Sequence, residues 1–120
     1  MRSCLFVVIL AAAGAQAQVV QPLMQNTPAS MFTDEDRRIF LAAWKKLLEQ
    51  DADNATESWT NPKNGHGGVL TLQRSFEWRA NPCKEVRIRN QAQGRKADTT
   101  LNSCKVDGKW RLVSAEQLAK

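Results

Sequence analysis

Few side chains in this chain could carry chemistry: it has one histidine, three cysteines and more basic than acidic residues. His66 stands in the glycine-rich stretch 61–68, where it could bind a metal or a substrate. We expect a solvated loop histidine, because no serine–histidine–aspartate or cysteine–histidine arrangement accompanies it. Gly65-His66-Gly67-Gly68 also lacks the lysine and the strand-to-helix setting of a phosphate loop. The sequence therefore predicts no catalytic residue, no metal site and no cofactor.

The N-terminus carries the pattern of an export signal. Arg2 precedes an apolar run over 5–13, and Ala15-Gln16-Ala17 has the small-x-small form of a signal-peptidase site. The apolar run is too short to span a bilayer, and the rest of the chain predicts no transmembrane segment. Cys4 precedes the run, whereas a lipid-attachment cysteine would follow it, so no lipid anchor is expected. We predict a signal peptide over 1–17, cleaved near Ala17, and a soluble mature protein.

Cleavage would leave two cysteines, Cys83 and Cys104, in an oxidising compartment. An even cysteine count there predicts a disulfide, and two buried free thiols are the alternative. A metal site is disfavoured because His66 is the only histidine and no cysteine pair has ligand spacing.

One helix is expected near the start of the mature chain. The stretch 18–31 has no charge and no lasting periodicity, which is typical of a flexible leader. Thr33 can then cap a helix whose acidic first turn includes Asp36, a weaker form of the capping box. Apolar residues recur at helical spacing up to Leu48. An amphipathic helix over about 34–50 is predicted, with its apolar face in the core; docking of that face on a membrane or a partner is the alternative.

The rest of the chain predicts strands and tight turns. A short strand is expected over 56–60 and a longer one over 69–78, followed by a turn over 79–82. The longer strand is expected to place four apolar side chains on one side, which are Leu70, Leu72, Phe76 and Trp78. Arg74 breaks that alternation, so a β-bulge is expected there.

Two further turns fix the register of the last forty residues. Gln93-Gly94 suits a two-residue hairpin turn, and folding there places Cys83 opposite Cys104. Opposed residues in antiparallel strands are close enough for a disulfide. Asp107-Gly108 suits a second hairpin turn, which places Arg111 opposite Cys104.

This register divides the side chains between two faces of a sheet. The expected core face holds Val86, Ile88, Leu101, Trp110 and Leu112. The expected wet face holds the disulfide with Glu85, Arg87, Arg89, Asp98, Lys109 and Arg111. Asp98, opposite Arg89, is expected to neutralise part of its charge and leave Arg87 and Arg111 as the freer charges. The fold class is α+β: an N-terminal amphipathic helix packed on one face of an antiparallel sheet of about four to five strands, with one cross-strand disulfide.

Several of these residues carry a family resemblance. They are Trp59-Thr60-Asn61-Pro62, then Gly65 and Gly68-Val69, then Cys83-Lys84-Glu85-Val86, and finally Cys104 to Leu112 with its Asp-Gly-x-Trp. The chain resembles the C-terminal domain of the bacterial 17 kDa surface antigen family over about 54–113. The resemblance implies a small cell-envelope domain, so 32–120 is expected to be a single surface-antigen-like domain. The longer family members have a glycine-rich membrane-associated stretch and a lipid-attachment cysteine, which this chain lacks; that favours a free periplasmic form over surface display.

Charge is the remaining functional signal. Residues 61–120 hold twelve basic and five acidic groups, a surplus that could attract lipopolysaccharide phosphates, anionic peptidoglycan groups or an acidic envelope protein. Export argues against nucleic acid, and a merely solvated basic sheet is the alternative to binding. The hypothesis is a non-enzymatic exported envelope protein, periplasmic or outer-membrane associated, with a candidate binding face of Arg87, Arg89, Lys109 and Arg111. A small secreted hydrolase or enzyme inhibitor using the 61–68 loop is the other candidate; a cleft lined by His66 and a carboxylate such as Glu57 would favour it.

Overall fold

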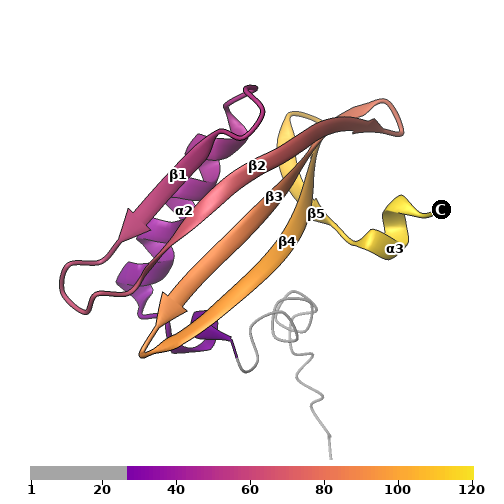
Figure 1. The fold of residues 1–120 in the computed structure, drawn as a ribbon. Helices are drawn as coiled ribbons and strands as arrows, with labels where there is room; N and C mark the ends of the chain where they lie inside the picture. The colour runs from indigo at the N-terminus through magenta and orange to yellow at the C-terminus, as the bar shows by residue number, and fades with distance from the viewer. Residues whose placement is uncertain (1–26) are drawn as a thin grey trace, which may run out of the picture.

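The computed structural model describes residues 27–120, which form one five-stranded antiparallel sheet with a helix packed against it (Figure 1). In chain order the elements are η1 Pro28–Met31, α2 Asp34–Leu48, β1 Thr56–Thr60, β2 Gly67–Trp78, β3 Asn81–Ala92, β4 Arg95–Val106, β5 Lys109–Val113 and α3 Ala115–Leu118. The expected signal peptide 1–17 and the first part of the expected leader lie outside the described residues. Within 27–120, no helix is both long and apolar enough to cross a membrane.

The sheet is a meander in which each strand pairs with the next along the chain. Both expected hairpin turns are present, and the residues in them have positive φ, for example 51° at Gln93 and 76° at Gly94. The predicted registers of both strand pairs are confirmed: Cys83 lies opposite Cys104 in β3 and β4, and Arg111 lies opposite Cys104 in β5 and β4. Period-two alternation from these fixed points then decides which face each side chain joins.

Helix α2 begins where its capping residues predict. Thr33 Oγ1 accepts a hydrogen bond from the Asp36 backbone N–H at 3.1 Å, and the Asp36 carboxylate accepts one from the Thr33 backbone N–H at 2.9 Å. The helix ends at Leu48, two residues before the expected end. Lys84 of β3 lies at this end, and its ammonium donates to the Leu48 carbonyl at 2.7 Å and also to the Gln50 carbonyl.

The main core lies between α2 and one face of the sheet, which we call the inner face. Leu47 and Leu48 of the helix pack against buried side chains of β1, β2 and β3: Trp59, Leu70, Leu72, Val86, Ile88 and Ala92. Phe32 and Phe40 meet the edge of the Trp59 ring, with centroids 5.0 and 6.0 Å away. The core therefore includes an aromatic cluster at the end of the helix where η1 joins it.

The expected β-bulge is present, but its effect on the face pattern is larger than predicted. The register between β2 and β3 shifts between Leu72 and Arg74, where one extra residue is inserted. Leu70 and Leu72 point into the main core, whereas Phe76 and Trp78 turn to the opposite, outer face of the sheet. The prediction of one side for all four was therefore wrong, because an added residue reverses the alternation that follows it.

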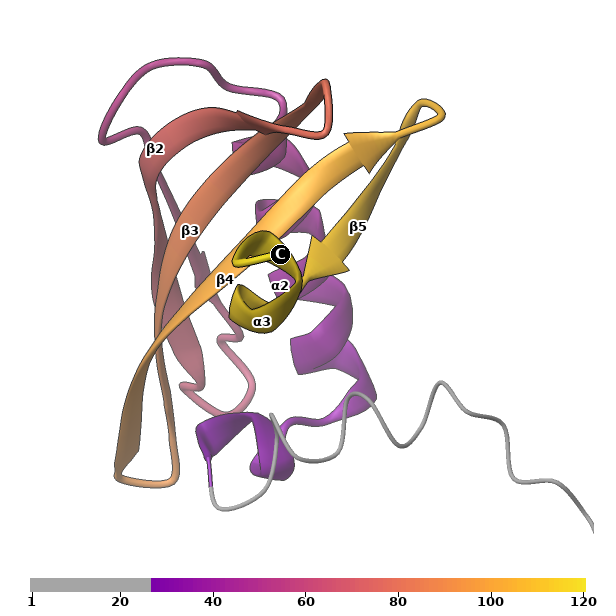
Figure 2. The same cartoon turned by 90° about the vertical axis from the view of Figure 1, so that its right-hand side faces the viewer.

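The disulfide joins Cys83 and Cys104 on the outer face, but it is not exposed as expected. The cysteines are 1% and 0% exposed and pack with Val113, Phe76, Trp78, Val106 and Leu118. Leu118 belongs to α3, which lies on the side of the sheet opposite α2 (Figure 2). The outer face thus carries a second small core at this end.

Two further expectations need correction. The prediction that Leu112 lies in the core was wrong: its side chain is 50% exposed, because α2 packs mainly on β1 and β2. Residues 28–31 were assigned to a flexible leader, but they form η1, whose Pro28 is buried and whose Ala29 and Met31 pack on the main core. Figure 1 shows η1 beside the β3–β4 turn, at one end of the sheet.

Candidate functional site

Three charged side chains form an ion cluster on the outer face, which consists of Arg87 and Arg89 on β3 and Asp98 on β4. Arg87 Nε donates to Asp98 Oδ1 at 2.8 Å, and Arg87 Nη2 also bonds Asp98 Oδ2. Arg89 Nε lies 3.3 Å from the same Oδ2. Two guanidinium groups share one carboxylate, so the cluster keeps a net positive charge.

The expectation that Asp98 would mainly pair with Arg89 and leave Arg87 freer was wrong. Arg89 is directly opposite Asp98, yet Arg87, its diagonal neighbour, makes the shorter, two-point contact. Hydrogen bonding by Arg87 is the main reason why the pKa of Asp98 falls to about 2, although partial burial opposes it, and the same contact raises the pKa of Arg87. Arg89, with its side chain 61% exposed, is therefore the freer cation.

A hollow of about 410 Å³ lies beside the two arginines on the same face. Its lining is mostly polar and comprises Asn54, Val69, Thr71, Gln73, Arg87 and Arg89. Gln73 is the residue between the paired positions Leu72 and Arg74, so the bulge brings its amide to this lining. The hollow offers guanidinium, amide and hydroxyl groups to an oxygen-rich anion.

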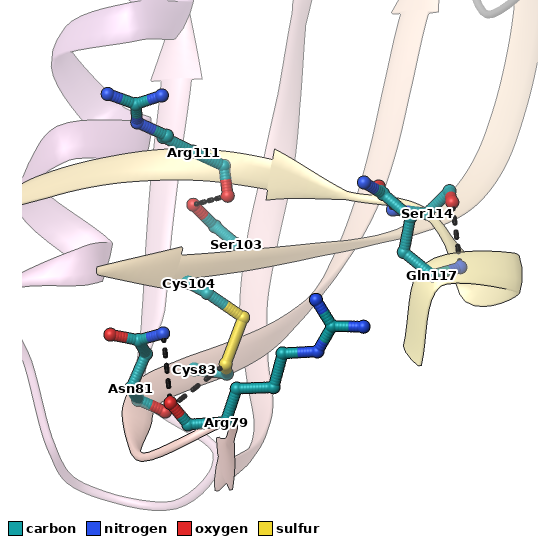
Figure 3. The surroundings of a disulfide bond; sticks show 8 residues. All are labelled: Arg79, Asn81, Cys83, Ser103, Cys104, Arg111, Ser114 and Gln117. Carbon is teal, nitrogen blue, oxygen red and sulfur yellow. Dashed lines mark hydrogen bonds between the residues drawn. A yellow bond between two sulfur atoms is a disulfide. The ribbon is translucent and has the colours of Figure 1, made fainter. Parts of the chain in front are cut away.

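The other two residues of the candidate face lie apart from this cluster. Lys109 and Arg111 are on β5, and Arg111 is opposite Cys104. Cys104 in turn pairs with Cys83 of β3. Cys83 is four residues from Arg87 on the same strand, which corresponds to roughly 13 Å between them along the strand. Figure 3 shows Arg79 beside the disulfide and Arg111 on the neighbouring strand, with its guanidinium directed away from the sulfur atoms. The structure therefore brings Arg87 and Arg89 together and leaves Lys109 and Arg111 near the second core.

His66 is buried, contrary to the expectation of a solvated loop residue. It is 5% exposed, and its Nδ1 lies 2.8 Å from Oδ2 of Asp36, which is fully buried. Asn61 and Asn64 donate to Asp36 Oδ1 at 2.7 and 3.1 Å. Burial raises the pKa of Asp36, but these bonds and that from the Thr33 backbone outweigh it, so the pKa lies well below its ordinary value. The network fastens the 61–66 loop to the start of α2.

His66 and Glu57, the residues expected to line a cleft in the enzyme alternative, do not lie together. Glu57 accepts a hydrogen bond from Gln50 Nε2 at 2.6 Å, and its other carboxylate oxygen faces Lys46 at 3.9 Å. His66 meets Asp36 instead, at the opposite end of β1. His66 and Glu57 are thus engaged in separate contacts.

The motif residues of the 59–68 segment have packing roles. A Cβ added to Gly68 would collide with Asn90 Oδ1 and would lie 2.5 Å from the Arg89 carbonyl oxygen. Trp59 Nε1 donates to the same Asn90 oxygen at 3.1 Å. Gly68 therefore allows β2 to approach β3 closely enough for the Trp59–Asn90 bond to form.

Sequence reasoning missed three features. Asp36 was recognised only as a helix cap, and no local signal indicated its buried partners, which are 25 to 30 residues away. Lys84 was not recognised as a buried cap for the last turn of α2, because that contact joins residues far apart in the chain. Helix α3 did have a signal, since Ser114 and Gln117 form a second capping box.

The comparisons with known proteins give one match of limited extent. No family model matches the chain, and no solved structure matches it. The chain is 28% identical over 83 residues to the 17 kDa surface antigen of Rickettsia prowazekii (strain Madrid E), a match that covers 68% of this chain. The chain spans about half the length of that relative, since the match covers 52% of it. This similarity supports the assignment of the chain, indicated by its cysteine spacing and its Asp-Gly-x-Trp motif, to the 17 kDa surface antigen family.

Proposed function

We propose that this chain is an exported, non-enzymatic protein of the bacterial cell envelope whose outer sheet face binds an anionic envelope component. The observation that carries the proposal is the pair Arg87 and Arg89, which share one carboxylate and border a polar hollow. The similarity to a surface antigen and the export signal expected from the sequence support the envelope location.

The chemistry of the hollow indicates the class of partner. Guanidinium groups bind phosphate and carboxylate through paired, charge-assisted hydrogen bonds, and amide and hydroxyl side chains suit the oxygens of a sugar. Lipopolysaccharide phosphates and peptidoglycan carboxylates both offer these groups, as does an acidic envelope protein. Lys109 and Arg111 would add attraction over a longer range.

Binding to two isolated materials tests the proposal. Purified outer membrane and purified peptidoglycan are sedimented separately with the protein, at low salt and near 1 M salt, where the Debye length is about 3 Å. We expect binding to at least one material at low salt and release at high salt. Fractionation of cells with a pull-down from envelope extract then identifies an acidic protein partner.

Two matched double variants locate the binding face. Arg87→Glu with Arg89→Glu and Lys109→Glu with Arg111→Glu change the net charge equally. We expect the first pair to weaken binding by more than tenfold and the second pair to weaken it less. Equal losses of binding in the two double variants would show that the attraction depends on overall charge. Binding that is unchanged by salt and by both double variants would contradict the proposal.

A single variant, Asp98→Asn, is expected to strengthen binding instead of weakening it. Asp98→Asn removes the carboxylate that both arginines share, so binding should strengthen if the guanidinium groups contact an anion. Thermal unfolding of each variant verifies that the sheet is retained. Weaker binding by a folded Asp98→Asn protein would argue against direct contact with the arginines.

A further inference from the structure

An apolar groove lies on the inner face of the sheet, beside the part that α2 covers. Helix α2 packs on β1 and β2, and η1 packs on β3 and β4 at one end. Between them the described residues leave a groove of about 320 Å³ that extends to Leu112 of β5. It is separate from the arginine hollow, which lies on the outer face.

The groove is lined mainly by large apolar side chains. Its wall on the helix side includes Phe32, Phe40 and Leu41, and its floor on the sheet includes Ile88, Leu101 and Leu112. Leu41 is 53% exposed and Leu112 is 50% exposed. Apolar side chains that converge on a concave surface are typical of a ligand site, whereas single exposed leucines are ordinary.

The charge of the lining is one-sided. Arg37 is the one ionisable side chain among the described residues that line the groove, and no carboxylate lines it. Its contacts are long: Nη2 lies 3.5 Å from Asp34, which is fully exposed, and Nη1 lies 3.4 Å from the Phe32 carbonyl oxygen. The guanidinium therefore keeps donors for an anion at this end of the groove.

We infer that the groove binds a long-chain fatty acid, with the acyl chain along the apolar lining and the carboxylate at Arg37. The apolar floor suits a hydrocarbon chain, and the lone cation suits a single negative head group. The volume lies at the lower end of the range for small-molecule pockets, which fits one chain better than a helix of a partner protein.

Binding of dodecanoate below its micelle concentration tests the inference. The protein, isolated from an exporting bacterial host and labelled with ¹⁵N, is titrated and its amide resonances are followed. We expect shifts to centre on Leu41, Ile88, Leu101 and Leu112, and not on Ala115 of α3. Acetate at the same concentration should cause none of these shifts, and dodecylamine, with the same chain and the opposite charge, should bind at least tenfold more weakly.

Three variants separate the acyl site from the head-group site. Leu112→Gln should weaken dodecanoate binding about tenfold, because it removes apolar contact from an exposed position that the fold does not need. Ala115→Gln is the control, since Ala115 is exposed on α3 and lines neither the groove nor the arginine hollow, and it should bind as the wild type does. Arg37→Gln should weaken dodecanoate about tenfold and leave dodecanol unaffected.

Three outcomes would overturn the inference. The first is the absence of groove shifts at saturating dodecanoate. The second is an equal effect of Leu112→Gln and Ala115→Gln, which would indicate non-specific adsorption. The third is a concentration-dependent dimer, seen by sedimentation, whose contact covers Leu41 and Leu112 and excludes dodecanoate. None of these results bears on the arginine hollow, so the proposed function stands or fails separately.

Discussion

His66 Nδ1 and Asp36 Oδ2 lie 2.8 Å apart, and both side chains are buried between the start of α2 and the loop that joins β1 to β2. The same loop holds its own shape, since the Asn61 backbone N–H donates to the His66 carbonyl oxygen at 2.8 Å. Asp36 therefore connects two segments that are far apart in the chain. The cost of burying its charge is offset by the donors that surround it.

Asp36→Asn should destabilise the protein and flatten its acid unfolding profile. The pKa of Asp36 is lower in the folded state than in the unfolded chain, so its contribution is complete above about pH 4 and is lost as pH falls toward the folded pKa. We expect a loss of about 3 kcal/mol at neutral pH, because the charge is removed and the amide nitrogen that replaces one carboxylate oxygen cannot accept a hydrogen bond, so part of the surrounding set of donors is left unpaired. Urea unfolding between pH 2 and 7 measures both effects.

Asp98→Asn is the control for that experiment, since its pKa is also lowered, to about 2, by Arg87. The Asp98 side chain is exposed, so this substitution should change the free energy of unfolding at neutral pH only slightly. If the acid slope of unfolding were the same in wild type and Asp36→Asn, the stabilising role of the buried carboxylate would be refuted.

Gly68→Ala should destabilise the sheet by about 2 kcal/mol or more. The new methyl group would meet Asn90 Oδ1 and the Arg89 carbonyl oxygen, so β2 and β3 would have to separate. The comparison variant is Gly94→Asn, where no atom lies within 4 Å of the added Cβ and asparagine tolerates the positive φ of 76°. Thermal unfolding measures both, and a melting temperature unchanged in Gly68→Ala would contradict the close approach.

The sheet was predictable because its signals are local. Gln93-Gly94 and Asp107-Gly108 specify two-residue turns, and each turn fixes a register by arithmetic from its own position. The disulfide then followed from that register and the count of cysteines. The bulge could be placed from Arg74, but its consequence for Phe76 and Trp78 required the number of inserted residues, which the sequence pattern does not specify.

Burial was predicted less well, because it depends on what covers each face. Leu112 lies on the inner face as expected, yet it is half exposed, because α2 packs mainly on β1 and β2. His66 stands between two glycines and Lys84 is a charged residue, yet each contacts a buried acceptor more than 25 residues away. The separation of Arg111 from the Arg87 and Arg89 pair follows from the register itself, since Arg111 lies opposite Cys104 and Cys104 lies opposite Cys83, four residues from Arg87.

Replacing both Cys83 and Cys104 by alanine should lower the free energy of unfolding by about 3 kcal/mol. The bridge joins residues 21 apart, and a closed loop of this length restricts the unfolded chain by about that amount. Packing adds to the loss, because both cysteines are buried against Phe76 and Trp78. Urea unfolding of the oxidised wild type and the double variant measures the difference; a loss below 1 kcal/mol would not fit a buried bridge.

Lys84→Met should shorten or loosen the end of α2 without disturbing the sheet. The Lys84 ammonium is the donor to the Leu48 and Gln50 carbonyls, and it lies 3.3 Å from Asp51 Oδ1. Methionine keeps most of the side-chain volume but cannot donate, so we expect a loss of about 2 kcal/mol from the unpaired carbonyls. Lys105→Met on β4, where the lysine is exposed, is the matched control. Amide hydrogen exchange should then accelerate at 47–50 in Lys84→Met alone; faster exchange throughout the sheet, or equal effects of the two variants, would show that Lys84 does not act through the helix end.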